Sequence, residues 1–183
     1  MDVLTLVISA VSLLVAGVGT YQANKRANEA LAESRKAAED ARWFEVQEAV
    51  QRLIGFDPAA EPVGERLANL RITSIALVDQ LDGWDGLDSW LEAERTLGAT
   101  IGRQVLEAAK PGDTVERRVA NLDPLMSWAH ALSSNLRYLR SAGYAADALA
   151  KLQVNAEGHV KDIHARHGWD MPPRTNPRIQ PLE

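Results

Sequence analysis

The sequence predicts an all-α fold: a single N-terminal transmembrane helix continues into a long juxtamembrane helix, and a small helical bundle follows. Three observations predict this fold. Residues 3–23 form an apolar run without a charged side chain. Residues 24–53 contain neither proline nor glycine and are rich in strong helix formers. Further along, apolar residues recur every three or four positions between loops that contain proline and glycine.

The uncharged run from Val3 to Ala23 is long enough to cross a bilayer as a helix. At about 1.5 Å per residue it extends roughly 30 Å, which is the thickness of the hydrocarbon core. A cleaved signal peptide begins with basic residues, whereas only Asp2 lies between Met1 and this run, although residues 16–19 resemble a cleavage site. We therefore predict a transmembrane anchor at residues 1–23. A cleaved signal and a buried or oligomerising helix are the alternatives.

Basic residues close to the run predict its orientation. Lys25, Arg26, Arg35 and Lys36 follow it and no basic side chain precedes it. Because lysine and arginine stay on the cytoplasmic side, the N-terminus is expected outside and the rest of the chain in the cytoplasm. The chain has no cysteine, which fits a cytoplasmic domain and excludes disulfides and thiolate chemistry.

The stalk, residues 24–54, is predicted to be one helix with balanced charges, several of them paired one turn apart, such as Glu48 and Arg52. Small and apolar residues in it follow the alternating three-and-four spacing of a coiled coil. These are Ala27, Ala30, Ser34, Ala37, Ala41 and Phe44. Alanine buries little surface, so a solvated stalk and a self-associating coil both stay open. The apolar end of the stalk, around Val46 and Val50, is expected to dock on the bundle.

Residues 55–168 are predicted to form a cytoplasmic bundle of four main helices and a short one. We expect the main helices at 65–81, 89–109, 124–142 and 144–167, and the short one at 113–121. The helix at 65–81 is apolar around much of its girth and is expected at the centre of the core. A capping box at Ser89 and Glu92 and the pair Asp123-Pro124 predict two helix starts. The proline-rich tail, residues 169–183, is predicted to be extended or disordered.

Two side-chain groups suggest a metal site, and neither has the required spacing. The first is an acidic series, Asp79, Asp82, Asp85, Asp88, Glu92 and Glu94. Its spacing of three differs from the alternate positions of an EF-hand, so we interpret these acids as helix ends. The second group is His159, His164 and His167, near Asp162. A helical wheel places His159 on the apolar face and His164 away from it, so ordinary hydrogen-bonded or helix-end histidines are expected.

Other polar residues lack a catalytic pattern. His130, Ser133 and Ser134 have no partner motif, and phosphate-binding glycine loops are absent from the sequence. Arg117-Arg118 and the pair Arg137 and Arg140 form small basic patches, while the net charge of −5 argues against nucleic-acid binding. The abundance of alanine, and of arginine over lysine, indicates a bacterial or phage source.

These observations predict a non-enzymatic, single-pass membrane protein whose helical domain acts as a scaffold or regulatory partner. No catalytic, cofactor-binding or metal-binding residue is assigned, and no cofactor, nucleic acid or small-molecule substrate is expected. The predicted partners are the bilayer, through residues 3–23, and either another protein or a second copy of the chain. The alternatives are a phage- or toxin-like membrane-active protein, a soluble oligomer assembled through the N-terminal helix, and a metal enzyme based on the histidines.

Overall fold

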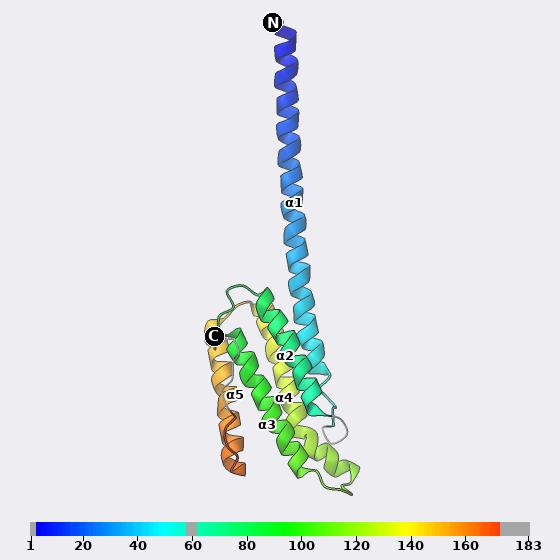
Figure 1. Cartoon of the computed structure of the whole chain (residues 1–183), viewed down its shortest axis with the longest axis vertical. Coiled ribbons are helices and arrows are strands. Elements are labelled where there is room, and N and C mark those ends of the chain that lie inside the picture. The colour runs from blue at the N-terminus through cyan, green and yellow to red at the C-terminus, as the bar shows by residue number, and fades with distance from the viewer. Residues whose placement is uncertain (1–2, 58–61, 173–183) are drawn as a thin grey trace, which may run out of the picture. The chain divides into compact units, whose positions relative to one another are not determined.

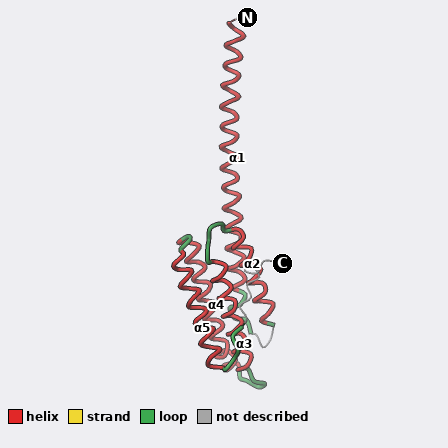
Figure 2. The backbone as a smooth tube through the Cα atoms, turned by 60° about the vertical axis from the view of Figure 1, so that its left-hand side comes forward, coloured by secondary structure: helices red, strands yellow, loops and turns green. Residues whose placement is uncertain are grey.

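A computed structural model describes residues 3–57 and 62–172, with the side chains from residue 22 onward except that of residue 63. This part of the chain contains five α-helices and no strand (Figures 1 and 2), which confirms the predicted all-α class. The helices are α1 (Val3–Gln51), α2 (Val63–Gln80), α3 (Leu87–Ala108), α4 (Val115–Ala142) and α5 (Ala146–His167).

The chain divides into two compact units, Met1–Ala41 and Arg42–Glu183. Helix α1 is continuous over its whole length, so the predicted anchor and stalk belong to a single helix, as expected. In the first unit, the side chains of residues 22–38 are all exposed. The second unit contains the last turns of α1 together with helices α2 to α5.

None of the helices in the described part of the chain is both long enough and apolar enough to cross a membrane. The structure therefore gives no support to the membrane-spanning part of the predicted fold. The predicted anchor falls on residues 1–23, and the side chains of residues 1–21 lie outside the described part of the chain.

Helix α3 lies at the centre of the bundle, because it packs against α2, α4 and α5. The prediction that residues 65–81 form the central helix is wrong. Helix α2 packs on α3 through a narrow stripe that includes Leu70 and Leu77, while Ile72 and Ile75 are 67% and 37% exposed. The wide apolar face predicted for this helix therefore consists of one buried stripe and one exposed stripe.

The end of α1 is part of the core, as its apolar pattern predicted. Its buried residues are Trp43, Val46, Ala49 and Val50, and Leu53 is buried just after the helix ends. The ring of Trp43 contacts that of Trp84 edge to face, with their centroids 5.6 Å apart. These contacts fix the last turns of α1 within the second unit.

The predicted helix break at Asp123-Pro124 is wrong. Helix α4 runs unbroken from Val115 to Ala142 with Pro124 inside it, so the predicted short helix and its successor are one element. Its N-cap is Thr114, whose hydroxyl accepts a hydrogen bond from the Arg117 N–H at 3.3 Å. Leu122 and Leu125 pack against the core on either side of the proline, and this packing outweighs the lost backbone hydrogen bond.

The start of α3 differs from the predicted capping box. The helix begins at Leu87, after Gly86 with a φ of 88°, so Ser89 lies in the first turn and does not cap it. The carboxylate of Glu92 instead accepts a 2.8 Å hydrogen bond from Nε of Arg95. Gly86 occupies the N-cap position in a left-handed conformation, and no side chain caps this helix start.

Candidate functional site

A buried carboxyl group on α3 is bonded to two tryptophans. Oε1 of Glu94 accepts a 3.0 Å hydrogen bond from Nε1 of Trp90, one turn earlier on the same helix. Oε2 accepts a 2.8 Å hydrogen bond from Nε1 of Trp128 on α4. Glu94 is 7% exposed, so both bonds are shielded from water. A carboxylate in this position is stabilised by two N–H donors that it also satisfies.

A glycine allows this arrangement. Gly98 lies one turn after Glu94, and a Cβ atom there would lie 2.3 Å from Cη2 of Trp128. The indole ring of Trp128 therefore rests directly on the backbone of α3.

Burial raises the pKa of Glu94 above its ordinary value, because the ionised form loses its hydration. The hydrogen bonds from Trp128 and then Trp90 act in the opposite direction, since they favour the carboxylate, and the charge of His159 does the same. Desolvation is the larger effect. Sequence reasoning placed Glu94 among acids at helix ends, whereas the structure places it in the core.

A second buried polar cluster joins the end of α5 to α3. Nδ1 of His164 lies 2.7 Å from the carbonyl oxygen of Asp170, and Nε2 lies 3.3 Å from Oγ1 of Thr100. A carbonyl only accepts, so Nδ1 carries a hydrogen and donates it. His164 is 6% exposed and both of its ring nitrogens are engaged.

Trp169 covers this cluster. Its ring stacks on His167 with centroids 4.4 Å apart, and the guanidinium of Arg103 lies 3.9 Å from its centroid. The His164 ring meets it edge-on at 5.5 Å. Gly168, with a φ of 66°, turns the chain back so that Trp169 can reach α3. The first residues of the predicted tail thus pack against helices, while residues 173–183 lie outside the described part of the chain.

The histidines are arranged in the opposite way to the helical-wheel prediction. His164 is buried and His159 is exposed. The buried positions Ala156, Val160 and His164 are four residues apart, and this spacing could have identified His164 from the sequence. Within residues 3–57 and 62–172, no group of three or more acidic or histidine side chains could hold a metal ion.

A third polar contact joins α1 to α4. Oγ of Ser133 donates to Oε1 of Gln47 at 3.1 Å and accepts from Nε2 of Gln51 at 3.2 Å. The backbone oxygen of Ser133 accepts from Nε2 of Gln47 at 3.1 Å. Sequence reasoning found no partner for Ser133, because its partners lie on a helix far away in the chain.

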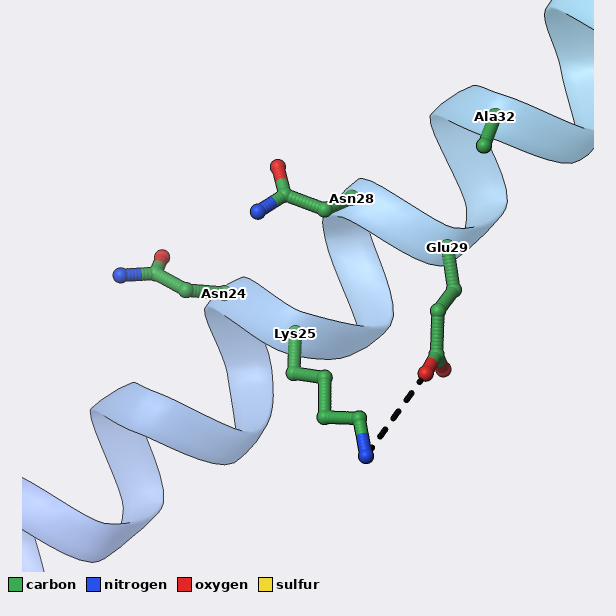
Figure 3. Close-up of a pocket in the computed structure, with 5 residues that line it drawn as sticks. All are labelled: Asn24, Lys25, Asn28, Glu29 and Ala32. Atoms are coloured by element: carbon green, nitrogen blue, oxygen red, sulfur yellow. Dashed lines mark ion pairs between the residues drawn. The ribbon is translucent and has the colours of Figure 1, made fainter.

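Polar side chains also gather along a shallow surface strip on α1. Figure 3 shows that Asn24, Lys25, Asn28, Glu29 and Ala32 all come from this one helix. Nζ of Lys25 lies 3.9 Å from Oε1 of Glu29, and both side chains are 65% exposed. One face of one helix cannot enclose a ligand, and an exposed ion pair of this kind contributes little.

Glu94, Ser133 and His164 thus each bond to a side chain of another helix. No protein family, curated protein or solved structure matches this chain.

Proposed function

We propose that the chain is a non-enzymatic, single-pass membrane protein whose helical domain binds another protein or a second copy of itself. In this proposal residues 3–23 cross the bilayer, the N-terminus lies outside, and the bundle lies in the cytoplasm. The observation that carries it is the uncharged run in the sequence, followed at once by Lys25 and Arg26.

The exposure of α1 supports the interaction role. Residues 22–38 make no buried contact in the single chain, and Leu31 is 52% exposed. Helices in proteins gain most of their stability from packing one face against another element, so contact with a partner helix would stabilise this exposed stretch. In the second unit, Phe44 and Ile72 are 64% and 67% exposed and offer apolar contact area.

The buried polar contacts of the bundle favour a structural domain over an enzyme. Glu94, Ser133 and His164 have their hydrogen-bonding atoms engaged by other side chains or by the backbone. None of these groups is paired with a nucleophile in the way that general-base catalysis requires.

Carbonate extraction and protease accessibility test the proposal. The full chain with a C-terminal epitope should stay in the membrane pellet at high pH, and the epitope should be digested only after the cytoplasmic side is opened. Leu13→Arg should release the protein, since an arginine at mid-membrane costs about 2.5–3.5 kcal/mol. Ala32→Arg, on the exposed strip of α1, is the matched control and should stay in the pellet. A wild-type chain that carbonate extracts completely would refute the anchor and favour the soluble oligomer.

Chemical crosslinking of the same preparation tests self-association. A chain that associates through the coiled-coil positions of α1 should lose its crosslinked species in the double variant Ala30→Glu/Ala37→Glu. Ala32→Glu lies off those positions and should crosslink like the wild type. Equal crosslinking in all three proteins would exclude this surface and place self-association on another one, whereas a wild type without a crosslinked species would leave a different protein as the partner.

A further inference from the structure

The carboxyl group of Glu94 connects two helices through two donors. Trp90 lies on α3 itself, whereas Trp128 belongs to α4, so the 2.8 Å bond to Trp128 is the one that crosses between helices. Each carboxyl oxygen accepts one indole N–H. The ionised group has acceptors only, so its negative charge strengthens both indole hydrogen bonds.

Protonation weakens both bonds. A neutral carboxyl keeps acceptor capacity on its oxygens, but its hydrogen bonds lose the assistance of the negative charge. Trp90 is held beside Glu94 by the helix itself, because the two residues are one turn apart. Trp128 belongs to α4, so the weakening of its bond is the change that acts between helices.

We propose that Glu94 is a proton-dependent link between α3 and α4, in which the carboxylate holds both indoles and the neutral acid holds the indole of Trp128 more weakly. The device is built from a buried carboxyl group, two indole donors on different helices, and a glycine that lets one ring lie on the helix backbone. Acidification loosens this one contact while the apolar core around it stays packed.

The charged groups around Glu94 are few on every helix that packs against α3. The buried face of α2 is apolar apart from Ser74, and that of α4 is uncharged. From α5, His159 acts on Glu94 electrostatically, while His164 is bonded to Thr100 and Asp170. On α3 itself, the guanidinium of the neighbouring Arg95 is paired with Glu92.

Desolvation supports the proposal by raising the pKa of Glu94. The group therefore takes up its proton at a less acidic pH than an exposed glutamate does, before the bulk of the surface carboxylates are neutralised. A positive charge on the exposed His159 favours the carboxylate and limits this rise.

The indole N–H signals of the five tryptophans test the proposal in the full-length protein, kept in detergent micelles and labelled with ¹⁵N. Substitution of each tryptophan by phenylalanine assigns the signals. On acidification, the Trp128 signal should move to lower proton frequency with a single midpoint above the pKa of an ordinary glutamate. The Trp90 signal should move less, and both should return when the pH is raised.

Two variants and one internal control decide the result. Glu94→Gln cannot titrate, so the transition of Trp128 should be lost. Glu92→Gln lies on the same helix and should leave it unchanged. If Glu94→Gln does not fold, the Trp43 signal in the wild type serves instead, because that indole is buried without a hydrogen-bond partner. A Trp128 signal that stays constant until the protein unfolds, or that moves together with the Trp43 signal, overturns the proposal.

Discussion

The substitution Gly98→Ala tests how closely α4 approaches α3. The added Cβ would lie 2.3, 2.6 and 2.8 Å from Cη2, Cζ2 and Cζ3 of Trp128. Ordinary carbon contacts lie at about 3.5–4.0 Å, so the ring must move by roughly 1 Å or more. That movement stretches or breaks the 2.8 Å hydrogen bond from Trp128 to Glu94.

The expected loss of stability is the sum of three effects. Overpacking costs about 1–3 kcal/mol, and loss of a hydrogen bond to a charged group costs about 1.5–3 kcal/mol. Alanine is favoured over glycine in a helix by about 1 kcal/mol, which offsets part of this. The free energy of unfolding of the second unit should therefore fall by about 1.5–5 kcal/mol.

Urea denaturation followed by circular dichroism measures this change, with Gly158→Ala as the matched control. Gly158 also lies inside a helix, but a Cβ there would meet nothing within 4 Å. The control should gain about 1 kcal/mol from helix propensity alone. If Gly98→Ala is stabilised to the same extent as Gly158→Ala, the close packing of Trp128 on α3 is refuted.

Three further substitutions have distinct expected outcomes. Burial raises the pKa of Glu94, so the folded chain binds this proton more tightly than the unfolded chain, and the contribution of the group to stability falls as the pH rises through its folded pKa. Urea denaturation across a pH series measures the unfolding free energy of the wild type and of Glu94→Gln. As the pH rises over that interval, the wild type should lose stability relative to Glu94→Gln, and a constant difference between the two would contradict this. Ser133→Ala removes the hydroxyl bonds to Gln47 and Gln51 of α1 and should cost about 1–3 kcal/mol in the same assay, whereas Ser134→Ala removes only bonds within its own helix and should stay within about 0.5 kcal/mol; equal effects would exclude the link. His164→Ala should destabilise the protein and shift the fluorescence of the neighbouring indole to longer wavelength, while the exposed His159→Ala should change neither, and a wild-type spectrum in His164→Ala would count against the cluster.

The helices of the bundle were predictable because apolar side chains recur with the helical period. The limits of α2 and α5 were predicted to within two residues, since loops with proline or glycine bound them. Pro124 was misleading for a physical reason: the local pattern of a helix start and that of a proline inside a packed helix are the same. Only the contacts of Leu122 and Leu125 with the core distinguish them.

The buried polar residues were harder to predict, and for different reasons. Glu94 and His164 each continue a buried stripe at a spacing of four, from Trp90 and from Val160, so their burial could have been read from the sequence. The hydrogen-bond partners of Glu94 and His164 could not be predicted from the sequence. Trp128 and Thr100 lie on other helices, and only the packing of those helices brings the groups together.

The contact between Ser133 and the two glutamines of α1 has a mechanical consequence. Gln47 and Gln51 both reach the same serine from one face of α1, so the contact fixes both the height and the rotation of α1 against α4. A slip of one residue would turn α1 by about 100° and break all three bonds. These three bonds therefore couple the end of α1 to α4, so that a pull or a twist applied to the last turns of α1 acts on α4 directly.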